Sequence, residues 1–125
     1  MSLISSLLGN AGAIEKSVLE KDYAKLLIPS EGIEAGFKII RDTFIFTNKR
    51  LIIVDVQGLT GRKIEYFSVS YKSISRFSIE TAGSFDLDAE LKIWISGEQS
   101  PSISKRFNRN VNIYEVQQLL AEFTL

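Results

Sequence analysis

The chemistry open to this chain rests on carboxylates, hydroxyls and basic side chains, because its 125 residues include no cysteine and no histidine. Thiolate nucleophiles, disulfides and the usual zinc ligands are therefore missing. So is the side chain best suited to proton transfer near neutral pH. We expect a protein that is not an enzyme and that holds no cofactor.

Three carboxylates occupy alternate positions at Asp86, Asp88 and Glu90, with about 7 Å between successive side chains if the segment is a strand. A straight strand diverges its ligands, whereas calcium sites converge them from a bent loop. A catalytic acid and base would need a cleft and two different environments. We therefore expect neither a metal site nor a catalytic pair. Two interpretations stay open: a solvated strand face, or a polar assembly surface shared with Lys92 and Trp94.

The segment from Gly58 to Lys63 combines two glycines with two bases. A P-loop needs a longer glycine spacing and a helix after it, but here the glycines are three residues apart and a strand follows. We interpret the segment as a hairpin whose glycines supply positive φ. The alternative is a patch for an anionic lipid or another phosphorylated ligand. It would consist of Lys49, Arg50, Arg62 and Lys63.

Other reactive combinations are weaker. Ser73 and Ser104 are each next to a lysine in the sequence, which could suggest a serine nucleophile with a lysine base. Neighbouring residues of a strand point to opposite faces, so neither pair of side chains would meet. Four aromatic residues near bases could stack on single-stranded nucleic acid, but we interpret them as core. They are Tyr66, Phe67, Tyr71 and Phe77. With 15 basic and 15 acidic residues, no net field draws the chain to nucleic acid or to a membrane. We expect neither as a partner.

The sequence pattern predicts a mostly β domain, which would position both the acidic strand face and the basic hairpin. Residues 1–30 are predicted to be a helical segment that Pro29 ends, with a short helix at 3–8 and a second from Ala13. From Ile33 onward apolar residues recur with period two, which is typical of strands. We predict strands at 33–39, 44–47, 51–56, 64–71, 74–81, 85–96 and 103–107, and a helix from residue 110 capped by Asn112.

Seven consecutive antiparallel strands curl into a barrel or split into two packed sheets, and an amphipathic terminal helix can close one open end. The length suits one domain. The apolar start of the chain is short and has no preceding base, and no apolar run reaches the eighteen or so residues of a membrane span. We therefore expect a soluble, cytoplasmic protein.

Residues 47–63, 71–74 and 80–97 resemble, in this order, the bacterial pleckstrin-homology-like family, and the resemblance covers about residues 20–125. It implies seven antiparallel strands in two roughly orthogonal sheets that form a partly open barrel over 31–125, capped by the C-terminal helix. It also implies that the chain, as a single-domain member, assembles with copies of itself into a closed ring, which we expect to be five-fold. A hydrophilic surface where strands of neighbouring copies meet would then bind a protein partner.

Overall fold

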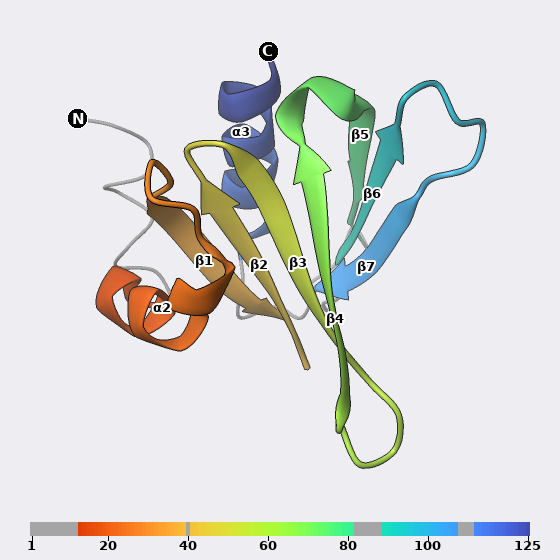
Figure 1. Cartoon of the computed structure of the whole chain (residues 1–125). Coiled ribbons are helices and arrows are strands. Elements are labelled where there is room, and N and C mark those ends of the chain that lie inside the picture. The colour runs from red at the N-terminus through yellow and green to blue at the C-terminus, as the bar shows by residue number, and fades with distance from the viewer. Residues whose placement is uncertain (1–12, 40, 82–88, 108–111) are drawn as a thin grey trace.

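Seven strands form the two sheets of the computed structural model, which describes residues 13–39, 41–81, 89–107 and 112–125 (Figure 1). The strands are β1 Ile33–Ile39, β2 Asp42–Thr47, β3 Arg50–Gln57, β4 Lys63–Ser70, β5 Ile74–Glu80, β6 Ala89–Ile95 and β7 Ile103–Phe107. One sheet has the order β1-β2-β3-β4 and the other β5-β6-β7, and every pairing is antiparallel.

Two helices and two single 3₁₀ turns complete the described elements. They are α2 Lys16–Tyr23, η1 Ala24–Leu26, η2 Tyr71–Ser73 and α3 Ile113–Thr124. The side chain of Asn112 accepts a hydrogen bond from the backbone N–H of Tyr114 at 3.0 Å. This bond satisfies a donor that the first turn of α3 would otherwise leave free, so the predicted cap is confirmed.

The main core lies between the two sheets and α3. Alternate residues of the strands point into this core. Examples are Phe37 in the first sheet and Leu91 and Ile93 in the second. Phe123 of α3 stacks on Tyr71 with ring centroids 4.9 Å apart and on Phe46 at 5.8 Å. Because α3 contributes a continuous apolar stripe, it covers one open side of the space between the sheets.

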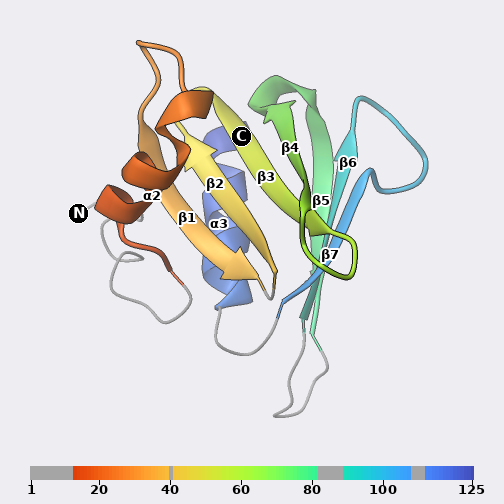
Figure 2. The ribbon, with the colours of Figure 1, turned by 60° about the horizontal axis from the view of Figure 1, so that its bottom comes forward.

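A second cluster covers the other face of the four-stranded sheet. Leu19 of α2 is fully buried there with Ile45 and Ile52. Gly36 permits this contact, since a Cβ on Gly36 would lie 2.6 Å from Cδ1 of Leu19. The sheet is thus enclosed by α2 on one side and by the main core with α3 on the other (Figure 2).

The predicted architecture is confirmed: seven antiparallel strands form two sheets with a C-terminal helix and a short N-terminal helix, and the sheets are not closed into a barrel. The predicted helix at 3–8 lies outside the described residues, and α2 begins at Lys16 rather than at Ala13. Of the strand predicted at 85–96, only the part from Ala89 is described. In the described part of the chain, no helix is long and apolar enough to cross a membrane.

Candidate functional site

The outer face of the three-stranded sheet holds the described residues of the predicted interaction surface. Leu91 and Ile93 point into the core, so their neighbours on β6 point away from it. The pairing register places residues of β5 and β7 beside them. We call this surface the polar face; it consists of Arg76, Ser78, Glu80, Glu90, Lys92, Trp94, Ser104 and Arg106. No helix of the described chain covers it (Figure 1).

Ion pairs connect the charged residues of the polar face. Lys92 Nζ lies 3.3 Å from Glu80 Oε1 and 3.8 Å from Glu90 Oε1. The hydroxyl of Ser104 donates to Glu90 Oε2 at 2.9 Å. Exposed ion pairs of this kind contribute about 0–1 kcal/mol to stability, so their main effect is to hold the charged groups at defined positions on the surface. Asp86 and Asp88 lie outside the described residues.

Trp94 is the one described aromatic side chain on the polar face. Its indole Nε1 donates to the carbonyl of Gln99 at 3.1 Å, and the guanidinium of Arg76 lies 4.8 Å from the ring centroid. A cation above the ring and a hydrogen bond at its edge hold the indole in one orientation. Sequence reasoning missed Arg76, because its position beside Trp94 depends on the pairing of β5 with β6.

The four bases of the alternative anion patch do not come together. Lys49 and Arg50 lie at one end of β3, whereas Arg62 and Lys63 lie beyond its other end. Arg50 pairs with Ser70, and Gln57 pairs with Lys63. Seven residues of strand at about 3.3 Å each separate the two ends by about 23 Å.

Arg50 is engaged inside the protein. Its Nε and Nη2 donate to the two carboxylate oxygens of Glu31 at 2.8 and 2.9 Å, and Nη2 also donates to the carbonyl of Leu26. The hydroxyl of Thr47 donates to Glu31 at 2.6 Å. The Glu31 side chain is only 1% exposed. The hydrogen bonds from Arg50 outweigh burial and lower the Glu31 pKa to about 2, and the same contact raises the pKa of Arg50.

The contacts of Arg50 with Glu31 and Leu26 hold the turn between the helical segment and β1 against β3, so Arg50 has a structural role. Arg50 also lines a pocket of about 380 Å³, and Lys49 is the other basic residue in that lining. The sequence offers no signal for the contact, because Glu31 and Arg50 are 19 residues apart and no periodicity connects them.

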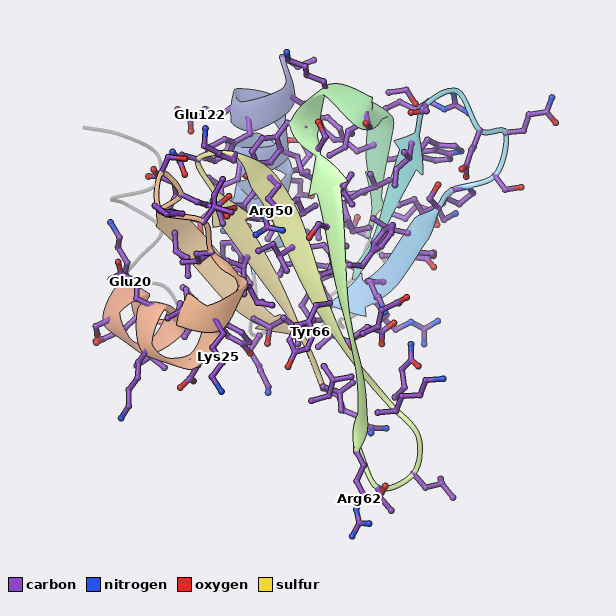
Figure 3. The ribbon with its side chains drawn as sticks, viewed as in Figure 1. Glu20, Lys25, Arg50, Arg62, Tyr66 and Glu122 are labelled. Atoms are coloured by element: carbon purple, nitrogen blue, oxygen red, sulfur yellow. The ribbon has the colours of Figure 1, made fainter. Side chains whose placement is uncertain are left out.

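The glycine segment is a hairpin, as predicted. Gly58 and Gly61 have φ values of 81° and 69°, which non-glycine residues rarely adopt. Leu59 is fully exposed at the tip. Arg41 braces the hairpin by donating from Nη2 to the carbonyl of Gly58 at 2.6 Å. The side chain of Arg62 points away from the body of the protein (Figure 3).

The prediction that the four aromatic residues are core is wrong for two of them. Tyr66 is 48% exposed and Phe67 36%, whereas Tyr71 and Phe77 pack against the main core as predicted. Both exposed rings belong to β4, which pairs only with β3 among the strands that the structure describes and is exposed along most of its length. Val69 of β4 is buried in the main core, but the rest of the strand extends past the core and leaves its side chains exposed, however apolar they are.

A charged cluster joins the two sheets. Lys105 Nζ on β7 lies 2.9 Å from Asp42 Oδ2 on β2 and 3.5 Å from Asp55 Oδ2 on β3. Burial alone would lower the pKa of Lys105, but the hydrogen bond and the charge of Asp42 outweigh it and the pKa is raised. Lys105 contacts Asp42, whereas the hydroxyl of Ser104 contacts Glu90 on the polar face. The two side chains therefore point to opposite faces of β7, as predicted for adjacent strand residues. Among the residues that the structure places, no group of three acidic side chains could hold a metal ion.

The chain is similar to known bacterial proteins over nearly its whole length. The family model for the bacterial PH domain matches residues 2–124. The uncharacterized protein YjqA of Bacillus subtilis is 53% identical over 121 residues, which cover 97% of each chain. The uncharacterized protein YozO of the same organism is 32% identical over 110 residues, covering 88% of this chain and 93% of that one.

Two crystal structures share the fold. The pleckstrin homology domain from Shewanella amazonensis superposes with a TM-score of 0.83 at 40% identity and covers 99% of both chains. A protein of the DUF1696 family with a pleckstrin-homology domain, from Shewanella loihica, gives 0.79 at 43% identity and covers 94% of this chain and 99% of that one. None of these relatives indicates an enzyme family.

Proposed function

The chain belongs to the bacterial PH domain family, and from this premise we propose that it is a non-enzymatic domain that assembles into a ring of five copies and presents its polar face to another protein. The proposal of a ring rests on the resemblance to this family. We place the protein in the cytoplasm as part of the same proposal. The observation that supports the interaction surface best is Trp94, a large aromatic side chain on a sheet face that no described helix covers.

Aromatic residues and arginine are enriched at protein interfaces, and the Trp94–Arg76 pair offers both in a fixed orientation. The ion pairs of Lys92 with Glu80 and Glu90 would give the surface a defined charge pattern, which favours specificity over affinity. A ring needs a heterologous interface, in which one surface of a copy meets a different surface of the next. The polar face ends at β5, which pairs only with β6 among the described strands and so has a free edge for such a contact.

The variant Trp94→Glu is expected to shift the sedimentation profile from the oligomer towards the monomer, or to abolish partner binding, with little change in stability. The reason is that the side chain lies on the outer face, where its loss removes about one weak hydrogen bond and one cation–π contact. Lys25→Gln is the matched control, since it changes the net charge by the same amount on the exposed side of η1. An unfolded Trp94→Glu chain, or one that assembles and binds as the wild type does, would contradict the proposal.

A second candidate function is supported by the β3–β4 hairpin. Its tip carries the fully exposed Leu59, and Arg62 and Lys63 follow within four residues. An apolar side chain beside bases at the end of a projecting hairpin suits the surface of an anionic membrane. Because Arg50 is engaged with Glu31, this candidate rests on the hairpin rather than on all four bases of the predicted patch.

Co-sedimentation with vesicles tests this second candidate. We expect the wild type to pellet with phosphatidylserine vesicles at low salt, and less so as the salt concentration rises. Since each base near such a surface contributes about 1 kcal/mol, Arg62→Gln with Lys63→Gln should weaken binding by about 30-fold. The control pair Lys16→Gln with Lys21→Gln makes the same charge change on α2 and should bind normally. No pelleting of the wild type at low salt would end this candidate.

A further inference from the structure

β7 passes close to the four-stranded sheet (Figure 2). A groove of about 260 Å³ lies between residues of β7 and residues of β3 and β4. It is lined by Ile53 and Asp55 of β3, Glu65 and Phe67 of β4, and the run Ser102, Ile103, Ser104 and Lys105. Its volume lies below the ~300–1,000 Å³ of typical small-ligand pockets.

One wall of the groove is the edge of a strand. Side chains of successive strand residues point to opposite faces, so Ile103, Ser104 and Lys105 of β7 can line one groove together only if the edge of the strand borders it. β7 pairs with β6 and with no other described strand. Alternate residues of such an edge direct their backbone N–H and C=O groups away from the sheet, towards a further strand. The groove therefore offers backbone hydrogen bonds to an extended segment.

The opposite wall combines apolar surface with negative charge. Glu65 and Phe67 are two residues apart on β4 and therefore share a face, and Phe67 is 36% exposed. Glu65 makes no ion pair with any described residue. The single ammonium of Lys105 faces Asp42 and Asp55. Two carboxylates, Asp55 and Glu65, line the groove against the one ammonium, so its lining carries an excess of negative charge.

We propose that this groove binds an extended segment of a partner protein, which pairs with the free edge of β7 and adds a fourth strand to the β5-β6-β7 sheet. The inward side chains of the segment are one apolar residue against Phe67 and one lysine or arginine at Glu65. Strand addition draws its affinity from backbone bonds and its specificity from alternate side chains. The site is separate from Trp94, so the inference goes beyond the proposed function and stands without it.

A five-residue probe with the sequence valine, serine, lysine, serine, valine tests the proposal. In an extended conformation its two valines and its lysine share one face. Titration of a fluorescently labelled probe into the wild-type protein should give saturable binding. A probe with glutamate in place of lysine, and one N-methylated at the two serines and so unable to donate from them, should each bind about tenfold more weakly or worse.

The variant Glu65→Lys should weaken binding of the lysine probe by about tenfold or more and should strengthen binding of the glutamate probe. Glu20→Lys on the exposed side of α2 is the matched control and should bind both probes as the wild type does. Glu65 is exposed, so both variants should keep the wild-type unfolding midpoint. Equal affinity for all three probes, or no saturable binding, would overturn the inference. So would a change in the mass of the assembly with Glu65→Lys, since a second copy of the chain would then occupy the groove.

Discussion

Replacing Arg50 with methionine is expected to lower the free energy of unfolding by about 3–5 kcal/mol, the cost of leaving a buried charge without its partner. Glu31 is 1% exposed, and Arg50 supplies two of the hydrogen bonds to its carboxylate. Thr47 and the backbone N–H of Ile28 remain as donors, but neither carries a charge. The loss should appear as a lower midpoint in urea with an unchanged slope.

The matched control is Arg62→Met, which makes the same change at an exposed position of the hairpin and should alter stability by less than about 0.5 kcal/mol. The double variant Glu31→Gln with Arg50→Met removes both charges and should recover part of the loss. Equal midpoints for Arg50→Met and Arg62→Met would mean that the ion pair contributes nothing.

The same ion pair predicts how stability depends on pH. The pKa of Glu31 is about 2 in the folded protein against 4.5 as its ordinary value, so the folded state favours the ionised carboxylate. Its contribution is therefore fully present above about pH 4.5 and is lost as the pH falls towards 2. A shift of this size corresponds to about 3 kcal/mol. The Glu31→Gln variant should lack this part of the acid sensitivity, which urea midpoints at several pH values would measure.

The second large effect is expected for Leu19→Ala, which should cost about 2–5 kcal/mol. The Leu19 side chain is fully buried between α2 and the outer face of the four-stranded sheet. Gly36 lies directly beneath it and has no side chain that could fill the space. The surrounding strands are fixed by their own pairing, so the cavity should stay largely open.

Val18→Ala is the control for this variant, because the neighbouring side chain is 46% exposed and its truncation should cost well under 1 kcal/mol. We also expect α2 and the sheets to unfold in one transition, as one domain does. A separate early transition in the Leu19→Ala variant, seen by circular dichroism but not by Trp94 fluorescence, would mean that the helical segment folds as an independent unit.

Strand positions and the polar face were accessible from the sequence, because period two assigns each residue to one side of a strand. Leu91 and Ile93 point inward as their spacing predicts, and Lys92 and Trp94 point outward. Arg76 was not accessible, because its place beside Trp94 follows from how two strands pair, and pairing is not periodic.

Two other features depend on contacts that no local pattern records. Arg50 meets Glu31 only because the turn before β1 brings residue 31 beside the start of β3. Tyr66 and Phe67 are aromatic residues of the kind that usually fills a core, yet they are exposed because β4 pairs only with β3 among the described strands and most of it extends past the core. Residue type predicts burial only when the extent of the core is also known.

Sedimentation velocity of the purified wild-type chain at micromolar concentration decides whether the protein assembles into a ring. The chain has a mass of 14.0 kDa, and we expect one dominant species of about five times that mass that persists on tenfold dilution. A single species with the mass of one chain over the same concentration range would contradict it.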